Sequence, residues 1–398
     1  MSWSTVRADQ FCTLITDGTH DSPKPQQSGW KLITSKHLKG HYIDFDSANW
    51  ISEADYLKVI SRSAVEQWDI LFSMIGTIGN IYLEKNPHVE YACKNMGIFK
   101  FSGNKENALW MYYYLKSPQA KAYIQTHLRG STQAYVPLGG LREMPVPVPP
   151  KSVRNEIIAV LRPIDEKIEC NNAINDNLMQ QAVTIFKSWF VEYSPFDGIE
   201  PKEWETVNLE KITSLISRGI APKYSDNSDQ IVINQKCIRN HMIDLSQART
   251  HTPKVINEKW LRFGDLLINS TGDGTLGRAA QVWFQPQNIT VDSHVTVVRP
   301  AKENLIFYIG LWGVLHEREI ESLHTGSTGQ TELPKERVKA LELHLPDNGT
   351  LDRFNTLIAP MAAAIVSKQN ENNKLATLRD ALLPKLMSGE IDVSAVQL

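Results

Sequence analysis

The sequence presents the same order of landmarks twice, and this duplication constrains the fold more than any single motif. The Trp-x-Thr-Val pattern of residues 3–6 returns at residues 204–207. Gln133 returns as Gln330, and the offset of 197 residues then holds as far as Leu375. A register kept over that length predicts two tandem copies of one structural unit, because small insertions in surface loops leave a fold intact.

Length and composition fit two globular units in one chain. With 398 residues, of which 42% are hydrophobic, the chain can form two or three domains with their own cores. No apolar stretch reaches the roughly 18 residues of a membrane span, and the polar start does not have the pattern of a signal peptide. We therefore expect a cytoplasmic protein with no membrane partner. The isolated cysteines are expected to be reduced and structural, and they are Cys12, Cys93, Cys170 and Cys237.

The charge balance argues against a strongly basic nucleic-acid-binding surface. The net charge is −2 and the sequence pI is about 6.6, whereas many nucleic-acid-binding domains have a pI above about 9. Any surface that binds phosphates must therefore be local or supplied by a partner.

The residue pattern of each copy changes at a proline-rich segment. Before it, short apolar runs alternate with Gly, Asn, Asp and Ser, which is typical of strands and loops. After it, apolar residues recur with helical spacing. We therefore predict an α+β fold of two tandem mixed α/β domains, each followed by a long helix. The predicted boundaries are 1–148 for the first domain, 149–192 for its helix, 193–203 for a linker, 204–345 for the second domain, 346–389 for its helix and 390–398 for a tail.

Both helical segments carry apolar residues spaced alternately by four and three, which is the pattern of a coiled-coil seam. The two seams are expected to pack on each other, and an antiparallel arrangement would give the chain pseudo-twofold symmetry. Asn175 and Asn372 lie near the middle of their seams. There they would either form a buried polar pair that disfavours other registers or point to solvent, and both alternatives stay open. The predicted seam consists of Ile164, Ile168, Asn175, Leu178 and Ile185 in the first helix and Met361, Ile365, Asn372, Leu375 and Leu382 in the second.

Three short motifs recur in the same order in both copies. Asp69 and Asp265 each begin an Asp-(Ile/Leu)-Leu run, which is followed by a Gly-Thr-x-Gly run and later by a Gly-Ser-Thr loop with a nearby Gln. The residue before the aspartate is Gly264 in copy two but Trp68 in copy one. We therefore expect a local change in that turn of copy one.

Together and in this order, these features resemble the specificity subunit of Type I restriction-modification systems over nearly the whole chain. The second helical segment also ends in the Leu-Leu-Pro-Lys-Leu-Met-Ser-Gly-Glu-Ile run at residues 382–391, which matches that family. Members of the family have two target recognition domains, each followed by a long helix, and the helices form an antiparallel coiled coil. The resemblance therefore implies the same architecture for this chain.

The resemblance further implies a non-catalytic subunit in which each domain reads one half of a bipartite, gapped target in double-stranded DNA. The helices would set the gap and dock two methyltransferase subunits, and restriction and translocase subunits would complete a complex for phage defence. No cofactor is expected in this chain, whereas S-adenosylmethionine, ATP and Mg would be bound by the partners. The sequence agrees, because it contains neither a Gly-x4-Gly-Lys-Ser/Thr phosphate loop nor an Asn-Pro-Pro-aromatic motif.

The residues that would contact DNA are predicted from residue type and position in loops. Phosphate contacts need amides, hydroxyls and cations, whereas base reading favours Arg, Lys, Asn and Gln. An ordinary role as turn or strand-edge residues is the alternative for about half of them. Gly79, Gly277, Asp69 and Asp265 are expected to shape turns. The candidate DNA-binding residues are Thr34, Lys36, His37, Lys39, His41, Arg129, Gly130, Ser131, Thr132, Gln133 and Tyr135 in copy one and Asn234, Gln235, Lys236, Arg239, His241, Thr325, Gly326, Ser327, Thr328 and Gln330 in copy two.

Two possible catalytic signals are weak. Asp197 and Glu200 resemble part of a nuclease site but lie in a proline-containing linker, and His316-Glu317 lacks the second histidine of a zinc protease. A two-domain scaffold that joins protein partners without DNA specificity is the second hypothesis. A stand-alone DNA enzyme is the third.

Trp189 and Phe190, near the end of the first helical segment, could anchor a partner subunit because large aromatic residues often dominate interfaces. The alternative is that they complete the core of the helix pair. Trp189 lies on the predicted seam and is therefore expected in the core, whereas both alternatives stay open for Phe190.

Overall fold

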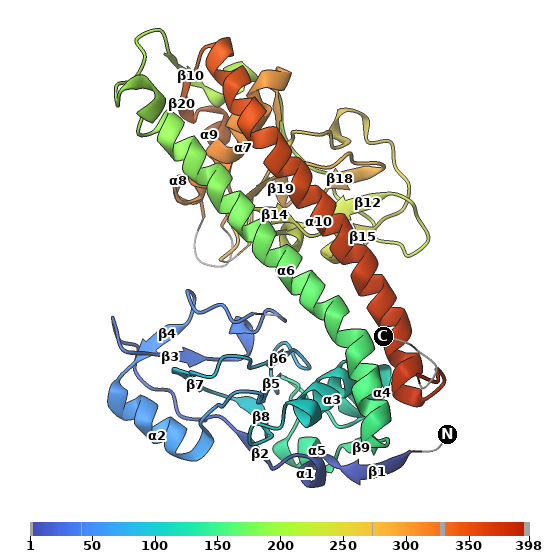
Figure 1. Ribbon diagram of the computed structural model, residues 1–398. Helices are drawn as coiled ribbons and strands as arrows, with labels where there is room; N and C mark the ends of the chain where they lie inside the picture. The colour runs from blue at the N-terminus through green and yellow to red at the C-terminus, as the bar shows by residue number, and fades with distance from the viewer. Residues whose placement is uncertain (1–2, 41, 273, 327–330, 394–398) are drawn as a thin grey trace. The chain divides into compact units, whose positions relative to one another are not determined.

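The chain forms two compact units (Figure 1). Unit 1 draws on residues 1–169 and 372–398, and unit 2 consists of residues 170–371. Each unit contains one predicted domain together with part of both long helices, so the units cut across the predicted boundaries between domain and helix. The computed structural model describes residues 3–40, 42–272, 274–326 and 331–393.

A four-stranded antiparallel sheet forms the centre of unit 1. Its strand order is β2-β8-β5-β6, and Leu71 of β5 pairs with Ile98 of β8. Every residue of β5 is buried, as expected for an apolar strand in the middle of a sheet. The strands are β2 (Leu14–Asp17), β5 (Ile70–Ser73), β6 (Ile81–Leu83) and β8 (Met96–Lys100).

A second sheet in unit 1 has the order β4-β3-β7, in which β3 pairs in parallel with β7 and antiparallel with β4. Helix α2 (Glu53–Ser63) begins after Ser52, whose hydroxyl oxygen accepts the Asp55 amide at 3.1 Å. The helix buries Tyr56 and Val59 in one cluster with this sheet. The strands are β3 (Trp30–Ile33), β4 (Asn49–Ile51) and β7 (Tyr91–Cys93).

Aromatic residues of helix α3 (Lys105–Lys116) fill the core of unit 1. Trp110 and Tyr113 are almost fully buried and cluster with Phe72 and Phe99 of the four-stranded sheet. Such large buried rings remove much apolar surface from water. The remaining elements are β1 (Ser4–Arg7), which pairs with β9 (Pro145–Val148), and the helices α1 (Ala8–Phe11), α4 (Pro118–Thr126) and α5 (Leu138–Glu143).

Unit 2 repeats this topology, with sheets of order β11-β19-β16-β17 and β15-β12-β18. Leu267 of β16 pairs with Val297 of β19, in the manner of Leu71 and Ile98 in unit 1. The units differ where unit 1 has α2, because the described residues between β15 and β16 form only a short 3-10 helix, η6 (Asn257–Lys259). The tandem α+β fold predicted from the repeat is confirmed.

The remaining bounds in unit 2 follow the same order along the chain. The strands are β10 (Glu205–Asn208), β11 (Thr213–Arg218), β12 (Ile231–Ile233), β13 (Ile238–Arg239), β14 (Met242–Ile243), β15 (Arg249–Thr250), β16 (Leu266–Asn269), β17 (Ala279–Gln281), β18 (Ile289–Val291), β19 (Val295–Pro300) and β20 (Glu342–Leu345). The helices are η2 (Ser194–Phe196), η3 (Leu209–Ile212), η5 (Leu245–Gln247), η7 (Glu303–Leu305), α7 (Ile306–Leu315), α8 (Glu317–Ser322) and α9 (Lys335–Lys339).

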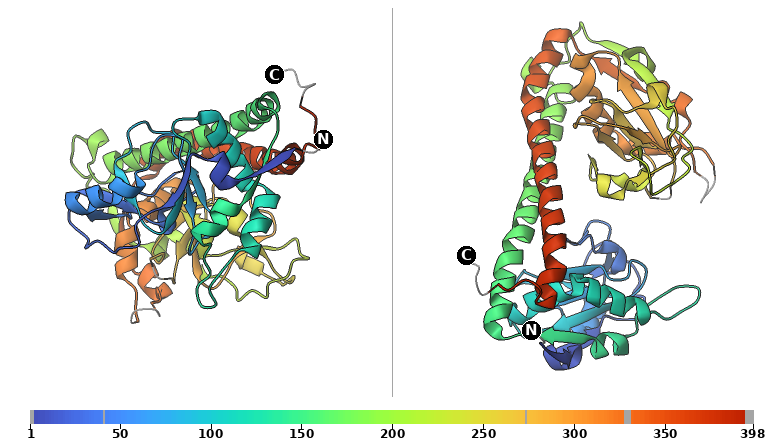
Figure 2. Two further views of the ribbon diagram at one scale, coloured as in Figure 1. Left: turned by 90° about the horizontal axis from the view of Figure 1, so that it is seen from below. Right: turned by 90° about the vertical axis from the view of Figure 1, so that its right-hand side faces the viewer.

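Two long helices, α6 (Lys151–Phe190) and α10 (Asn348–Ser388), contribute to both units (Figure 2). In unit 1, Leu161 of α6 and Leu386 of α10 belong to one core. In unit 2, the rings of Phe186 and Phe354 lie with their centroids 6.0 Å apart. The first part of each helix thus meets the last part of the other, so the helices pack antiparallel in each unit, as predicted. Within the described chain, no helix is long and apolar enough to cross a membrane.

The buried seam of α6 differs from the predicted seam by one residue at several places. Met179 is buried where Leu178 was predicted, and Phe186 is buried where Ile185 was predicted. An α-helix has 3.6 residues per turn, so a strict alternation of three and four residues drifts around a straight helix. The same shift puts Asp165 in the buried position predicted for Ile164, whereas Asn175 is buried as predicted and Ile168 is partly exposed.

In α10 the seam is shifted in the same direction. Ala362 and Leu383 are buried, whereas their predicted neighbours Met361 and Leu382 are partly exposed. Ile365 is buried as predicted. Asn372 and Leu375 are partly exposed.

The aromatic pair near the end of α6 belongs to the core of unit 2. Phe190 is buried against Tyr308 and Phe354, with ring centroids 4.9 Å and 4.8 Å away. Trp189 is only partly exposed, and its ring centroid lies 5.8 Å from that of Phe354. Phe190 is therefore a core residue, and Trp189 packs at the edge of the same core.

The change expected in the turn before Asp69 does not occur. Trp68 and Gly264 both have left-handed backbones, with φ of 71° and 90°. The units differ in the residue that faces this position: a Cβ at Gly264 would lie 2.8 Å from Cγ1 of Ile306, at the start of α7. In unit 1 the helix starts with Lys105, whose Nζ lies 4.8 Å from the centroid of the Trp68 ring. The expectation was wrong because the side-chain environment changes while the backbone stays the same.

Candidate nucleic-acid interface

Three segments that are distant in sequence come together in unit 1: the 3-10 helix η1 (Ser35–His37), the turn after β5, and the loop between α4 and α5. The hydroxyl of Thr77 in the turn donates to the carbonyl oxygen of Ser35 at 3.3 Å. The amide of Val136, at the end of the loop, donates to the carbonyl oxygen of Met74 at 2.9 Å. The two predicted DNA-binding strips and the Gly-Thr-x-Gly turn therefore form one continuous surface.

The same three segments meet in unit 2, where they are η4 (Gln235–Cys237), the turn after β16, and the loop between α8 and α9. The side-chain amide of Asn269 donates to the carbonyl oxygen of Gln235 at 3.1 Å. The amide of Leu333 donates to the carbonyl oxygen of Ser270 at 2.8 Å. The duplicated sequence thus builds the same candidate interface twice.

The second glycine of each Gly-Thr-x-Gly run closes its turn. Gly79 and Gly277 have left-handed backbones, with φ of 88° and 84°, which glycine adopts without steric strain. Their amides donate to the carbonyl oxygens of Ser73 at 3.0 Å and Asn269 at 2.9 Å. The prediction that these glycines shape turns is confirmed.

Asp69 and Asp265 are fully buried, and each stabilises the turn that precedes β5 or β16. Oδ2 of Asp69 lies 2.8 Å from Nζ of Lys100, and the carboxylate of Asp265 accepts two hydrogen bonds of 2.7 Å from Arg299. Each carboxylate also accepts the backbone amide three residues earlier in the chain at 2.8 Å. Burial raises the pKa of the Asp69 carboxyl above its usual value, although Lys100 opposes this shift. The prediction that both aspartates shape turns is confirmed.

Most of the unit 1 candidates are exposed. Lys36 and Arg129 have exposed side chains that form no hydrogen bond or ion pair with the described residues, so their donors are available for phosphate or base contacts. Thr34 and Lys39 are partly exposed, and Nζ of Lys39 donates to the carbonyl oxygen of Lys36 at 2.6 Å. The other exposed candidates are Gly130, Ser131, Thr132, Gln133 and Tyr135.

His37 is an exception, because only 2% of its surface is exposed. Its Nδ1 accepts the backbone amide of Thr34 at 2.8 Å, and burial lowers the pKa of the ring. His37 therefore stabilises η1, and the prediction that it contacts DNA is wrong. His41, Ser327, Thr328 and Gln330 lie outside the described residues, so their predicted roles stay predictions.

In unit 2, Lys236 and Arg239 are exposed and Asn234 is partly buried. The side chain of Asn234 is engaged at both ends: Oδ1 accepts the Lys236 amide at 2.8 Å, and Nδ2 donates to the carbonyl oxygen of Gln247 at 3.0 Å. Asn234 therefore caps η4, and its predicted contact with DNA stays a prediction.

The other unit 2 candidates remain accessible. Gln235 is partly exposed, and its Oε1 accepts the hydroxyl of Thr271 at 3.2 Å. His241 is partly exposed, with Nδ1 3.2 Å from Oε1 of Glu317. Thr325 and Gly326 are exposed.

Sequence analysis missed the turn that precedes β8 in unit 1 and β19 in unit 2. His294 is exposed, and its Nδ1 lies 2.7 Å from Oγ1 of Thr271 in the candidate interface. The equivalent residue in unit 1 is Asn95, whose Oδ1 lies 2.8 Å from Nδ1 of His20. The amide of Ser270 donates to the carbonyl oxygen of His294 at 2.8 Å, which joins this turn to the interface. No motif marks these residues, because their place depends on strand pairing across the sheet.

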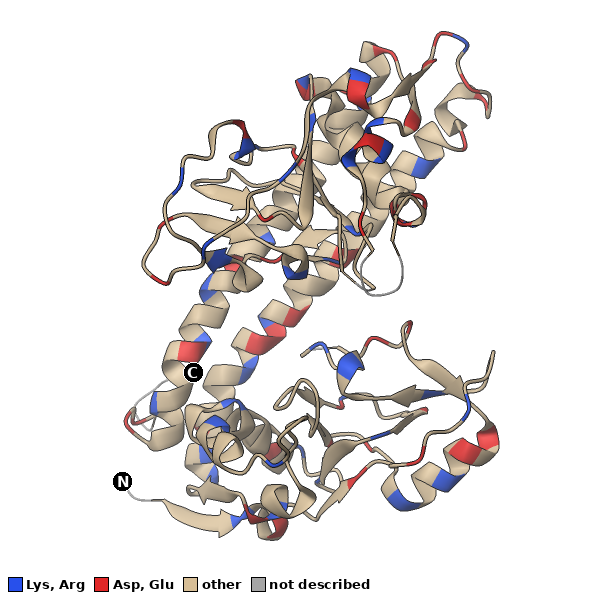
Figure 3. Cartoon of the chain, turned by 180° about the vertical axis from the view of Figure 1, so that it is seen from behind, with Lys and Arg blue, Asp and Glu red and all other residues tan. Residues whose placement is uncertain are grey.

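Charges of both signs are mixed over both units, as Figure 3 shows, in keeping with the net charge of −2. Within the candidate interface, the acids lie beside basic side chains: Glu332 pairs with Arg218, and Oε1 of Glu317 lies 3.2 Å from Nδ1 of His241. A surface of this kind suits contacts made by individual side chains better than binding through a broad positive field.

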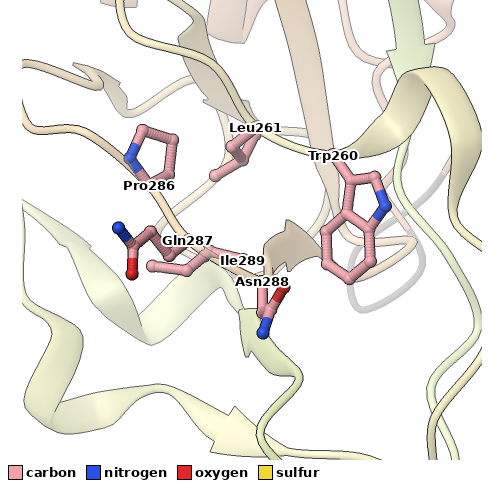
Figure 4. Close-up of a pocket in the computed structure, with 6 residues that line it drawn as sticks. All are labelled: Trp260, Leu261, Pro286, Gln287, Asn288 and Ile289. Carbon is pink, nitrogen blue, oxygen red and sulfur yellow. The ribbon is translucent and has the colours of Figure 1, made fainter.

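A pocket in unit 2 lies outside this interface (Figure 4). It is lined by Trp260, Leu261 and residues 286–289, at the start of β18. Because β18 runs parallel to β12, the pocket lies at the end of these strands opposite to η4. Among the described residues, no group of three His, Cys, Asp or Glu side chains could hold a metal ion.

The duplicated interface has a parallel in comparisons with known proteins. The family model described as "Type I restriction modification DNA specificity domain" matches the chain twice, over residues 3–180 and 201–359. The chain belongs to this family. The match covers both copies and includes the interface segments of each, so the resemblance noted from the motifs is confirmed.

Two curated relatives match this family member over most of their length. The Type I restriction enzyme MjaIX specificity subunit of Methanocaldococcus jannaschii is 26% identical over 390 residues, which cover 91% of this chain and 86% of the relative. The Type I restriction enzyme HindI specificity subunit of Haemophilus influenzae is 20% identical over 416 residues, which cover 86% of this chain and 90% of the relative.

A solved structure supports the fold of this specificity subunit family member. The S subunit of a Type I restriction-modification system from M. genitalium has a TM-score of 0.55 and 14% identity. The comparison covers 97% of this chain and 96% of that one. At this identity the likeness is one of fold alone.

Proposed function

We propose that this chain is the DNA sequence-recognition subunit of a Type I restriction-modification complex, and that each unit reads one half of a bipartite, gapped target in double-stranded DNA. The observation that carries the proposal is that one three-segment surface is built twice in a chain of the specificity family. A protein that reads two half-sites needs two such surfaces, and it needs them to differ where bases are read.

The two surfaces share their backbone but differ in their side chains, as this proposal requires. Lys36 and Lys236 occupy equivalent exposed positions and suit contacts to phosphate, which are independent of sequence. Unit 1 has Asn95 at the position that His294 occupies in unit 2, and these side chains offer different hydrogen-bonding groups. Two surfaces with the same backbone but different base-contacting side chains would recognise two different half-sites.

The chemistry is assigned to partner subunits in this proposal. Two methyltransferase subunits would dock on the chain and bind S-adenosylmethionine, and restriction and translocase subunits with ATP and Mg would complete the complex in the cytoplasm. This chain would bind and orient DNA without catalysing a reaction. The family match supports the assignment, since it concerns DNA specificity.

A long-read map of DNA methylation tests the proposal. Cells that express the chain with its methyltransferase subunits are compared with cells that lack only this chain, and with cells in which residues 1–148 come from another specificity subunit. We expect one gapped motif to depend on the chain and the exchange to replace only one half of it. A methylation map that does not change when the chain is deleted, while the partners are expressed, would support a scaffold instead.

A further inference from the structure

The turn before β19 in unit 2 is built rigidly. Asp292 is only 3% exposed, and its Oδ1 accepts the backbone amide of His294 at 2.9 Å. The amide of Asp292 donates to the carbonyl oxygen of Ile233, and the amide of Ser270 donates to that of His294, at 2.9 and 2.8 Å. Both the amide and the carbonyl of His294 are thus hydrogen-bonded, and Asp292 is itself anchored to β12, although the side chain of His294 is exposed.

The side chain of His294 is also held in place, by a chain of hydrogen bonds through Thr271 to Gln235. Thr271 donates its single hydroxyl hydrogen to Oε1 of Gln235 at 3.2 Å. With Oε1 of Gln235 as the acceptor of that hydrogen, the Thr271 oxygen accepts the hydrogen bond of 2.7 Å from Nδ1 of His294. Nδ1 of the neutral ring therefore carries the proton, and Nε2 has a lone pair that can only accept. No described residue donates to that nitrogen.

We propose that Nε2 of His294 reads an exocyclic amino group in the major groove of the half-site bound by unit 2. The amino groups of adenine and cytosine are the hydrogen-bond donors that bases present there, whereas guanine and thymine present acceptors. The inference rests on the proposed function and deepens it, because it names the group that one side chain recognises.

The same geometry argues against a phosphate contact. A phosphate oxygen is an acceptor and needs a donor opposite it, but the single N–H of the neutral His294 ring, on Nδ1, is already held by Thr271. A neutral ring in this tautomer therefore distinguishes bases by accepting a hydrogen bond at Nε2 from those that present a donor. Because its backbone and side chain are both held before DNA arrives, little conformational entropy is lost when it binds.

Unit 1 presents a different group at this place. Two residues, Lys94 and Asn95, separate β7 from β8, whereas three residues separate β18 from β19. Oδ1 of Asn95 is turned to the ring of His20 at 2.8 Å, so the carbonyl acceptor of Asn95 is occupied within unit 1. The reading assigned to His294 is therefore specific to one half of the target.

The test uses the full chain in its complex with the methyltransferase subunits. The wild type and the variants H294A, H294N, T271A and T271S are compared by methylation mapping and by competition between duplexes that differ at one base pair. H344A is the control, because His344 is another exposed histidine of unit 2 and lies on β20. The wild-type map itself tests the proposed function, since it must contain a motif that depends on this chain.

We expect H294A to relax one base pair in one half of the motif, with discrimination at that position reduced by about 5- to 150-fold. Relaxation at an A·T pair identifies adenine as the donor, and relaxation at a C·G pair identifies cytosine. T271A should weaken the same position less, T271S should retain it, and H344A should leave the motif unchanged.

Two results would overturn the inference. One is an unaltered motif in H294A and H294N with discrimination equal to that of the wild type. The other is a uniform loss of binding or methylation at all sequences in both variants, because that pattern indicates a phosphate contact or a structural role. Either result leaves the proposed function standing if the wild-type motif depends on the chain.

Discussion

Nη1 of Arg379 in α10 donates to Oδ1 of Asp165 in α6 at 2.8 Å within unit 1, and the equivalent positions of unit 2 hold Ala182 and Ala362. Asp165 also lies 3.0 Å from Nζ of Lys116 in α3. Both alanines are buried in the core of unit 2. The same place in the helix pair is therefore a buried ion pair in one unit and an apolar contact in the other.

This difference predicts an unequal response to substitution. Asp165→Ala should lower the free energy of unfolding of unit 1 by about 3 kcal/mol, because it removes a buried carboxylate that pairs with both Lys116 and Arg379, leaving Arg379 paired, among the described residues, only with the exposed Asp380. The double variant D165A/R379A, which copies the alanine pair of unit 2, should lose less than the sum of the two single variants. The unfolding free energies of the wild type, D165A, R379A and D165A/R379A are measured by urea-induced unfolding.

A matched control flanks Asp165 on the surface of α6. Arg162 and Glu166 form an ion pair in which both side chains are more than 40% exposed. Glu166→Ala should therefore change the unfolding free energy by less than about 1 kcal/mol. Equal losses from E166A and D165A would contradict the role assigned to the buried pair.

The same pair makes the stability of unit 1 depend on pH. Burial favours the protonated form of Asp165, but Lys116 and Arg379 outweigh it and hold the pKa of the carboxyl below its ordinary value of 3.8. A group whose pKa is lower in the folded state stabilises that state above the unfolded pKa, and this contribution is lost as pH falls through the folded pKa. The wild type should therefore lose its advantage over D165N below about pH 4.

The measurement is the difference in unfolding free energy between the wild type and D165N at a series of pH values from neutral to acid. Because other carboxylates titrate in both proteins, their effect cancels in the difference. A difference that stays constant through the acid range would show that Asp165 has the same pKa in the folded and unfolded states.

Much of this fold could be predicted from the sequence because the patterns that indicate it extend over many residues. The constant offset between copies and the helical spacing after each proline-rich segment predict two mixed domains and two packed helices. The exact seam did not follow, since the burial of Asp165 depends on a partner in α3 and another in α10. A heptad pattern is identified from apolar residues, so it does not predict buried ion pairs of this kind.

The interface was predictable only where exposed residues sit in recurrent loops. Lys36 and Arg129 are accessible, as their type and place suggest. His37 and Asn234 have the same residue types as DNA-reading side chains, but local hydrogen bonds in their 3-10 segments bury or occupy them. His294 went unnoticed because its neighbour Thr271 comes from the turn after β16, which is distant in sequence.

The glycine at position 264 is predicted to be required for the start of α7. Its backbone is left-handed, and a Cβ there would lie 2.8 Å from Cγ1 of Ile306. Gly264→Ala should therefore cost more than the roughly 1–2 kcal/mol of a left-handed residue that is not glycine. Gly198 is the control: it has φ of 74° but no atom within 4 Å of the Cβ position.

Thermal or urea unfolding of G264A and G198A gives the comparison. The double variant G264A/I306A should recover the part of the loss that comes from the collision with Ile306, apart from the packing that the smaller side chain removes. Losses of equal size in G264A and G198A would mean that the neighbouring isoleucine moves aside at little cost.

A paired extension of the two long helices should lengthen the gap in the target. The core of unit 1 uses α6 as far as Leu161 and α10 from Leu383, whereas the core of unit 2 uses α10 as far as Ile365 and α6 from Met179. Seven residues of heptad sequence inserted after Glu169 in α6, together with seven inserted after Glu371 in α10, therefore fall outside both clusters.

Each insertion adds about 10 Å of helix, which corresponds to about three base pairs of DNA. We expect methylation mapping to find both half-sites unchanged in sequence and separated by a gap about three base pairs longer. An insertion in α6 alone should abolish methylation, because it puts the two helices out of register while each core stays intact. A paired insertion that left the gap unchanged would show that the helices do not set the spacing of the half-sites.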